Sequence, residues 1–363
     1  NGNYISYSHD TFNAKSHSYF NLIQEISKGK NVSKNNFIES VDNKTISDVG
    51  YSVLLSGGID SSALISQLHN RVNFNTYSIL FEDNKFDESD YVKEISKKLN
   101  IDINFIKYNF KNIKNEISET QNFQEQPHGD SSFLALKKIC EEVSKYEKVT
   151  LSGDGADEIF GGYDYYFKSN KEIKNQILKN QIFSDEEINK LLLSDINFEN
   201  EKLDILNDIN YKFIDYENSL MLIDTLSLLP YNNFIKCDRM SMASSLELRT
   251  PFISKDLVIN ALFTSTKLKS SFENRKHFIK NNLLDKKIEF IKKRKKQTFI
   301  IPFNIFLRNE SKYLIKNKNK IHPIFNTRLF IDYCNSFISN DNYYSFRKFR
   351  NLYFLNIWLN EKL

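Results

Sequence analysis

Apolar runs and helical patterns alternate along the first half of the chain. The runs typical of buried strands cover residues 51–55, 76–81, 101–108 and 148–151. Between them, apolar residues recur at helical spacing over residues 63–68, 91–99 and 133–139. Strands that alternate with helices in this way form a parallel sheet with right-handed crossovers. We therefore predict an α/β fold, a parallel sheet with helices on both faces.

The second half of the chain has a different pattern. From about residue 171 onward the strand-like runs stop and helices are predicted. Residues 183–188 (FSDEEI) combine a capping box with a hydrophobic staple, which marks a helix start. We expect an α/β core over residues 31–170 and a mostly helical part over residues 171–363. Residues 1–30 belong to neither part and could form two short strands around a polar turn.

Composition narrows the class of protein. Of the 363 residues, 40% are hydrophobic and 26% charged, which excludes a disordered chain or a fibre. A net charge of +4 is well below the basic excess of nucleic-acid-binding domains, so no nucleic-acid partner is expected. No apolar run could span a bilayer, and the first residues are too polar for a signal peptide, so we expect a cytoplasmic setting. Three widely separated cysteines exclude a disulfide framework.

Glycine is concentrated in two short segments, each of which follows a predicted strand. These segments hold six of the ten glycines: Gly57, Gly58, Gly153, Gly155, Gly161 and Gly162. Ligands of parallel sheets bind beyond the carboxyl ends of the strands. We therefore expect the two segments to meet at one edge of the sheet, although about a hundred residues separate them.

The first segment, residues 56–62 (SGGIDSS), has the features of a phosphate-binding loop. Its small residues let backbone N–H groups approach a phosphate, and the following helix presents its positive N-terminus. Asp60 would repel phosphate unless a Mg²⁺ ion lies between them. The alternative interpretation is a Ser/Asp turn that only caps the helix.

The second segment, residues 151–163 (LSGDGADEIFGGY), places three carboxylates close together after a buried strand. The three are Asp154, Asp157 and Glu158, and their proximity is costly unless a cation compensates their charge. The alternative interpretation is an acidic loop that solvates a helix start.

Together these motifs resemble the synthetase domain of the glutamine-hydrolysing asparagine synthetase B-type family, within the PP-loop ATP pyrophosphatases. The resemblance continues with KCDRMSMA at residues 236–243 and SLELRTPF at residues 245–252. It ends with RKKQTF at residues 294–299, followed by Pro302. It covers the chain from about Ile38 to Phe306 and implies the adenine nucleotide α-hydrolase-like fold of that superfamily.

The resemblance implies how ATP and Mg²⁺ are bound. The residues that it assigns to the phosphates and the adenosine are Leu55, Ser56, Gly57, Gly58, Ser61 and Ser62. It places Ile79, Ser152 and Gly153 beside the adenine, and it gives the Mg²⁺ ion on the triphosphate to Asp60 and Asp157.

It also implies which residues are catalytic. Lys276 and Lys296 would face the pyrophosphate, while Asp154 and Glu247 would lie near the acyl carbon and the incoming amine. A cation at Lys296 suits the negative charge that develops on leaving pyrophosphate. The run of residues 292–296 (KKRKK) is also compatible with a solvated basic surface.

The activity implied is that of a ligase that forms a C–N bond and cleaves ATP to AMP and pyrophosphate. A substrate carboxylate attacks the α-phosphate to give an acyl-adenylate, and ammonia or an amine then displaces AMP. The implied partners are a small-molecule or glycan carboxylate and a source of ammonia. That source would be glutamine, through a glutaminase domain or partner that this chain does not contain. A homodimer is left open.

Three departures from the family pattern limit the resemblance. Residue 1 is Asn and no cysteine precedes Cys140, so the cysteine nucleophile of the family's glutaminase domain is missing. Residues 2–20 nevertheless resemble the closing segment of that domain, and residues 1–30 are therefore interpreted as the tail or linker of an upstream glutaminase-like domain. No arginine lies between Arg71 and Arg239, where asparagine synthetases bind aspartate with one. The family's PFLD stretch is PFIS here, over residues 251–254.

The substrate is therefore left open among aspartate, a sugar uronic acid of glycan synthesis and a side chain of a larger acceptor. An alternative function is that of a PP-loop tRNA-modifying enzyme, with RNA held by residues 292–296. A catalytically silent binding module would be expected to lack Asp60 or Asp157, and both are present.

Overall fold

The computed structural model describes most of the chain. The described ranges are residues 2–9, 13–70, 74–81, 88–109, 111–168, 173, 181–193, 201–209, 214–294, 303–340 and 342–362. Within them, no helix has both the length and the apolar character needed to cross a bilayer.

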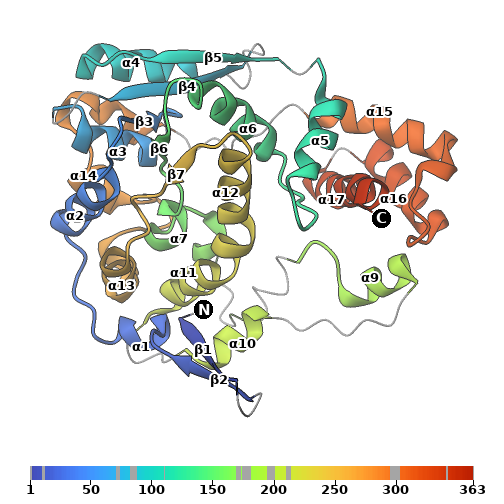
Figure 1. Ribbon diagram of the computed structural model, residues 1–363, viewed down its shortest axis with the longest axis horizontal. Coiled ribbons are helices and arrows are strands. Elements are labelled where there is room, and N and C mark those ends of the chain that lie inside the picture. Colours follow the sequence, from blue (N-terminus) through green and yellow to red (C-terminus); the bar gives the residue numbers. More distant parts are fainter. Residues whose placement is uncertain are drawn as a thin grey trace.

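A five-stranded sheet forms the centre of the molecule (Figure 1). Its strands, in spatial order, are β5 (Asn104–Tyr108), β4 (Asn75–Phe81), β3 (Tyr51–Leu54), β6 (Val149–Leu151) and β7 (Glu247–Arg249). All neighbouring pairs are parallel. The predicted parallel sheet is therefore confirmed. β7 was not predicted, because its three residues lie in a stretch of helices and are too short to give a strand pattern.

Helices cover both faces of this sheet. In the first half they are α2 (Lys34–Thr45), α3 (Ile59–Leu68), α4 (Ser89–Leu99), α5 (Ile113–Asn122), α6 (Ser132–Val143) and α7 (Ala156–Phe160). Side chains alternate along a strand, so Val53 packs in the core formed with α3 and α4 while Leu54 packs against the core formed with α6. The prediction of helices on both faces is confirmed.

The second half is mostly helical, as predicted. Its α-helices in the described ranges are α9 (Asp185–Leu192), α10 (Glu201–Asn207), α11 (Tyr216–Leu226), α12 (Ile235–Met242), α13 (Lys255–Phe263), α14 (His277–Asn282), α15 (Phe303–Lys316), α16 (Thr327–Ser339) and α17 (Tyr343–Lys362). The shorter turns are η1 (Asp164–Phe167), η2 (Leu229–Phe234), η3 (Thr266–Leu268), η4 (Lys286–Lys293) and η5 (Lys318–Lys320). The predicted helix start is present: Ser184 and Glu187 form a capping box.

Helices α15 to α17 gather beside α5 and share a separate apolar core (Figure 1). Its side chains include Phe303, Phe330, Phe337, Phe349 and Leu352, all almost fully buried. This second core gives the C-terminal helices a fixed position beside the sheet.

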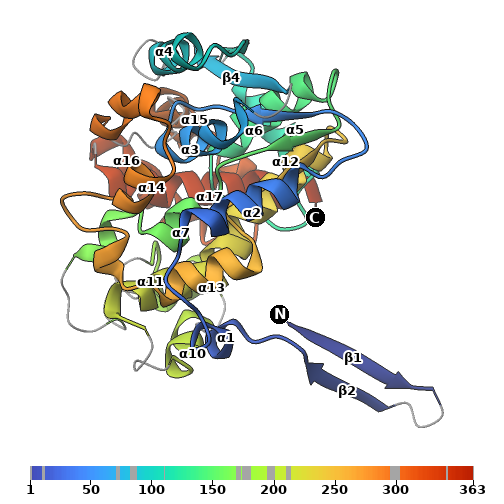
Figure 2. The ribbon, with the colours of Figure 1, turned by 90° about the vertical axis from the view of Figure 1, so that its left-hand side faces the viewer.

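The N-terminal segment stands apart from the body (Figure 2). It forms the antiparallel hairpin of β1 (Asn3–Ser8) and β2 (Asn13–Ser18), in which every described residue is exposed, and α1 (Leu22–Ile26) follows. The two predicted strands are present. A two-stranded hairpin is marginally stable alone, and its assignment to an upstream domain stays a prediction.

Lys269 is a fully buried lysine whose ammonium donates to two backbone carbonyls, those of Ile159 (2.7 Å) and Ala261 (2.5 Å). Burial lowers its pKa to about 7, and the Asp215 charge opposes this only in part. In the unfolded chain a lysine titrates near its ordinary value of about 10.4.

We therefore expect the free energy of unfolding to increase with pH between about 7 and 10, because in this window the unfolded state binds a proton that the folded state does not. Urea unfolding across this range should show that slope, and Lys269→Met should reduce it. Equal slopes for the two proteins would contradict the prediction.

Candidate active site

The first glycine segment forms a tight turn between β3 and α3. Gly57 has a φ of +70°, and a Cβ there would approach Tyr91 and Val92 of α4 to 3.3 Å. Gly58 is the N-cap residue of α3 and supplies no side-chain cap, so the first amides of the helix are left for a ligand. Glycine is therefore required at residue 57 by both backbone conformation and space.

Serine hydroxyls form hydrogen bonds within this turn. The Ser61 hydroxyl donates to the Gly58 carbonyl (3.2 Å) and accepts from the Ser56 amide (3.3 Å). The Ser56 hydroxyl accepts from the Gly58 amide (3.3 Å). Among the described residues, the buried hydroxyl of Ser62 has no hydrogen-bond partner. The loop is thus held in shape by its own side chains.

The second glycine segment lies directly against the first. A Cβ on Gly153 would come within 2.9 Å of the Ser61 amide nitrogen and 3.0 Å of the Asp60 Cβ. The amide of Ser152 donates to the Arg249 carbonyl (2.9 Å), which continues the pairing of β6 with β7. The expectation that both segments meet at the carboxyl edge of the sheet is confirmed.

Lys276 joins the aspartates of the two segments. Its Nζ lies 2.8 and 2.7 Å from the two carboxylate oxygens of Asp60 and 2.5 Å from Oδ1 of Asp157. Burial lowers the lysine pKa, but the two carboxylates outweigh burial and hold the pKa above its ordinary value. A Cβ on Gly162 would lie 1.6 Å from Asp157 Oδ1, so this contact also requires a glycine. Three distant parts of the chain therefore meet in one charged group.

The donor set suits Mg²⁺. This ion is commonly held by one or two carboxylates together with the phosphates of its nucleotide. Asp60 and Asp157 already converge on one cation, the Lys276 ammonium. Within the described residues, no group of three or more His, Cys, Asp or Glu side chains could hold a metal ion by itself. The residues present fit a metal that is shared with a nucleotide.

Glu158 is buried next to Asp157. Its carboxylate accepts from the Tyr163 hydroxyl (2.8 Å) and the Asn233 amide (2.8 Å). Burial, and then the charge of Asp157, raise the pKa of Glu158 to about 7. Asn233 belongs to η2, a π-helical turn. Its hydrogen bond to Glu158 therefore connects the second glycine segment to the helical half.

Asp154 lies at the end of β6 beside a second group of charges. It accepts from the Ser152 hydroxyl (2.7 Å), and its charge acts on the nearby Lys236 and Cys237. Lys236 donates to Asp130 (3.2 Å), which keeps the lysine pKa above its ordinary value although burial lowers it. Neither Lys236 nor Asp130 was predicted to be a site residue. Lys236 opens the KCDRMSMA stretch, but its pairing with Asp130, 106 residues away, depends on the fold.

Two of the thiols, those of Cys140 and Cys237, lie near Asp154 and are expected to be unreactive. Burial, and then the charge of Asp154, raise the pKa of Cys140 to about 12 and that of Cys237 well above its ordinary value. The reactive form of cysteine is the thiolate. The environment of these thiols therefore disfavours the sulfur transfer expected of a tRNA-modifying enzyme.

Ile79 lies on β4 two residues past the partner of Leu54. It therefore reaches the carboxyl edge of the sheet, together with Leu55, whose amide donates to the Tyr77 carbonyl (2.8 Å). The family resemblance implies that adenine binds at this edge of the sheet.

Glu247 does not join this group. It is the first residue of β7, opposite Val149, the first residue of β6, so it lies toward the amino end of the strand pair. Its exposed carboxylate pairs with Arg249 (2.7 Å). Asp154 follows the other end of β6.

Lys296 lies outside the described residues. The last described residue before it, Arg294, pairs with Glu88 and lies over the Tyr91 ring. Its Nη1 would be 3.4 Å from a Cβ on Gly57. The basic segment thus reaches the phosphate-binding turn at residue 294.

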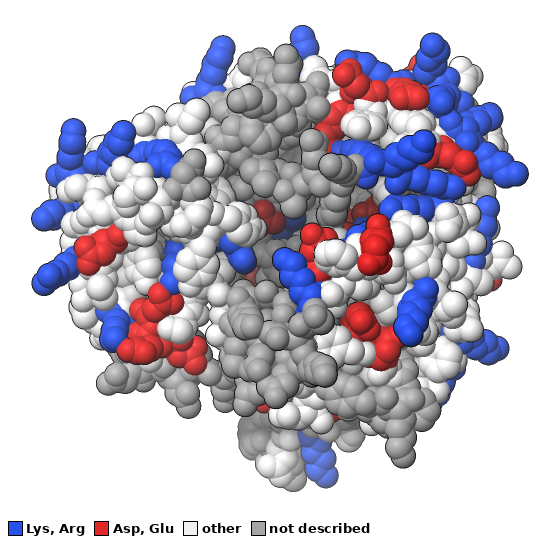
Figure 3. Space-filling model, turned by 180° about the vertical axis from the view of Figure 1, so that it is seen from behind, with Lys and Arg blue, Asp and Glu red and all other residues white. Residues whose placement is uncertain are grey.

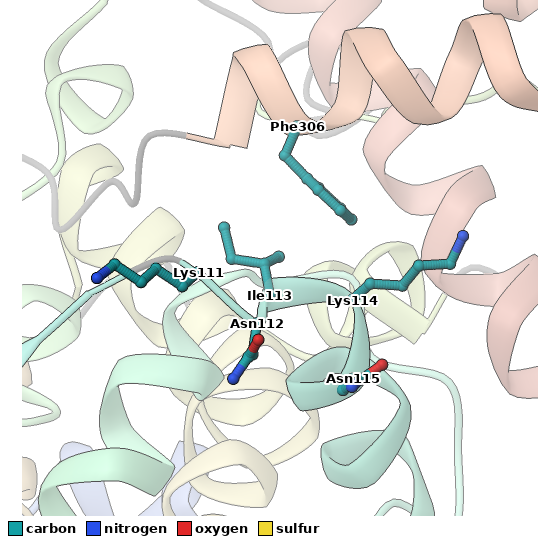
Figure 4. A pocket seen from close by; sticks show the side chains of 6 residues that line it. All are labelled: Lys111, Asn112, Ile113, Lys114, Asn115 and Phe306. Carbon is teal, nitrogen blue, oxygen red and sulfur yellow. The ribbon is translucent and has the colours of Figure 1, made fainter.

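Two hollows lie away from these residues. One, of about 300 Å³, is mostly apolar and lies between the loop of residues 127–129, α9 and α17. The other, of about 190 Å³, lies between the start of α5 and Phe306 of α15 (Figure 4).

On the face seen in Figure 3, basic side chains are interspersed with acidic ones around a central depression. Among the described residues of that face, basic and acidic side chains are mixed.

The fold and the site define an α/β protein in which a glycine-rich turn, two aspartates and a lysine meet at the carboxyl edge of a parallel sheet. The chain belongs to the asparagine synthase family, whose model matches residues 34–330. This confirms the family recognised in the sequence and is consistent with the PP-loop superfamily.

Individual relatives agree with this assignment. The chain is 27% identical over 321 residues to asparagine synthetase (glutamine-hydrolyzing) 1 of Bacillus subtilis, covering 77% of this chain and 50% of that protein. It is 33% identical over 120 residues to a putative asparagine synthetase of Methanocaldococcus jannaschii, covering 32% of this chain and 23% of that protein. The chain thus spans about half the length, or less, of these curated relatives.

A solved structure, the NMN synthetase from Francisella tularensis, covers 59% of this chain and 94% of its own. It has a TM-score of 0.27 and 14% sequence identity, too little to bear on fold or function.

Proposed function

We propose that the chain is an ATP-dependent ligase that adenylates a substrate carboxylate, releases pyrophosphate and transfers ammonia or an amine to the acyl carbon. The supporting observation is that the phosphate-binding turn, Asp60, Asp157 and Lys276 meet in one place. This place is the carboxyl edge of a parallel sheet, where the ligands of such sheets bind. A cytoplasmic location is part of the proposal.

In this proposal the nucleotide lies along the edge of the sheet. The N-terminal amides of α3 and the serines of the turn bind the phosphates. The residues that would contact the nucleotide are Leu55, Ser56, Gly57, Gly58, Ser61, Ser62, Ile79, Ser152 and Gly153. The unpartnered hydroxyl of Ser62 is a donor that such a ligand would satisfy.

The charged residues act on the departing pyrophosphate. Asp60 and Asp157 would hold Mg²⁺, which when bound compensates the charge of the triphosphate. Lys276 and Lys296 would supply fixed positive charge where negative charge grows as the bond to the α-phosphate breaks. Asp154 would orient the incoming amine at the acyl carbon. Glu247 is left out of this mechanism because it lies at the other end of the strand pair.

We further propose that the carboxylate belongs to an acceptor other than free aspartate. Where asparagine synthetases have an arginine, the chain has the loop that contains Asp130, which is already paired with Lys236. A sugar uronic acid or the side chain of a larger acceptor is consistent with the absence of that arginine.

Pyrophosphate release with ATP, Mg²⁺ and ammonium tests this function. The panel of carboxylates is aspartate, glucuronate, galacturonate and a short peptide with a glutamate side chain, and mass spectrometry identifies the amide. We expect carboxylate-dependent release with a member other than aspartate. Aspartate as the best substrate would contradict the acceptor proposal, and release with none of them would count against an amide ligase.

The nitrogen source gives a separate prediction. The chain used in the assay should take ammonium and be indifferent to glutamine, because its three cysteines are all buried and none is placed to attack glutamine. Product formation is compared with each nitrogen source at equal concentration. Amide formation supported by glutamine alone would show that this prediction is wrong.

A further inference from the structure

The Lys276 ammonium fills the space between the two aspartates that we assign to Mg²⁺. Its three N–H donors meet three carboxylate oxygens, two on Asp60 and one on Asp157, at 2.5–2.8 Å. The lysine side chain is 6% exposed, against 23% for each aspartate. The positive charge that stabilises these carboxylates in this structure is therefore a lysine of the protein itself.

A free divalent cation would have to compete with this lysine. Two carboxylates and one ammonium carry a net charge of −1, which attracts a dication less than −2 would. Two carboxylates are also few ligands for an ion that prefers six oxygens, and the described residues offer no third acidic or imidazole ligand. Both facts weaken the site for a metal ion that arrives without phosphates.

The backbone of Lys276 has an uncommon conformation that its neighbours fix. The residue has a left-handed conformation (φ 53°), and its amide donates to the Ser270 hydroxyl (2.9 Å). A Cβ on Gly162 would lie 2.5 Å from the lysine Cε, so the side chain runs directly over that glycine. A non-glycine residue in this conformation is uncommon, and such residues cluster at active sites and ligand clamps.

We infer that Lys276 is the resident cation of the metal site in the nucleotide-free protein, so that the divalent cation enters only together with the nucleotide. This inference rests on the proposed function. The phosphates give the ammonium new anionic partners, and the carboxylate oxygens it leaves become ligands of the metal ion. One lysine thus excludes free metal before binding and neutralises pyrophosphate afterwards.

Mn²⁺ binding, measured by the electron paramagnetic resonance of the free ion, tests this without any turnover. Without nucleotide, Lys276→Met should bind Mn²⁺ at least tenfold more tightly than the unaltered protein. Lys280→Met is the matched control, since Lys280 lies one turn further along α14 and donates to Asn274 (2.9 Å). The control should bind Mn²⁺ like the unaltered protein.

The non-hydrolysable analogue AMPCPP supplies a second measurement. It should raise the Mn²⁺ affinity of the unaltered protein at least tenfold, and that of Lys276→Met by less. Equal Mn²⁺ affinity of Lys276→Met and the unaltered protein would overturn the inference. Equal affinity of the unaltered protein with and without AMPCPP, at concentrations where the analogue is bound, would also overturn it.

These outcomes are separable from failure of the proposed function. If AMPCPP fails to bind even with Mn²⁺ present, the nucleotide site is wrong, while the comparison of Mn²⁺ affinities without nucleotide still decides the role of Lys276. Thermal unfolding of each variant establishes that it is folded. Lys276→Gln, which retains a polar group, should show the same tighter Mn²⁺ binding.

Discussion

Replacement of Asp60 or Asp157 by asparagine is expected to abolish pyrophosphate release from Mg²⁺·ATP. Each change removes an anionic oxygen that would both bind the metal ion and orient Lys276, which lies 2.7 Å from one carboxylate and 2.5 Å from the other. Asparagine keeps the shape of the side chain, so the fold should survive. Pyrophosphate release and thermal unfolding are measured in parallel.

Asp164→Asn is the matched control for this pair. Asp164 lies in the same stretch of chain as Asp157, but its carboxylate is 73% exposed and pairs with Arg275. Its activity should equal that of the unaltered protein. Near-normal turnover of Asp60→Asn or Asp157→Asn would remove the basis of the proposed metal site.

The second large effect is expected at Lys296. If this lysine faces the pyrophosphate, Lys296→Ala should lower kcat by about a hundredfold or more, with a smaller change in the KM for ATP, since the charge it neutralises grows as the bond breaks. Lys296→Arg should restore activity only in part, because a planar guanidinium does not replace a compact ammonium. Steady-state kinetics with ATP as the varied substrate measure both parameters.

Lys293→Ala is the control because Lys293 is an exposed lysine of the same basic run. A solvated lysine should change stability by less than about 0.5 kcal/mol and leave the kinetics unaltered. Similar kinetics for Lys293→Ala and Lys296→Ala would assign both residues to a solvated surface. The approach of Arg294 to Gly57 is the structural reason to expect otherwise.

Local sequence signals predicted the elements that depend on short-range order. The strand runs at residues 51–55 and 76–81 appear as β3 and β4, and the capping box at Ser184 begins α9. These local signals did not predict β7, because three residues that follow a helix are too few to show strand periodicity. β7 is a strand only because it pairs with β6. Glu247 shows the same limit: a motif assigns a residue to a site, but strand register decides which end of the sheet it reaches.

The sequence by itself determined the order of strands and helices in the first half of the chain, the two glycine turns and the family, because these depend on residues that are neighbours in the chain. Only the tertiary structure decided that Lys276 bridges Asp60 and Asp157, and that Asp130 pairs with Lys236. These partners are separated by about a hundred residues or more. Their contacts depend on how the sheet and the helical half pack together, and no local pattern contains that information.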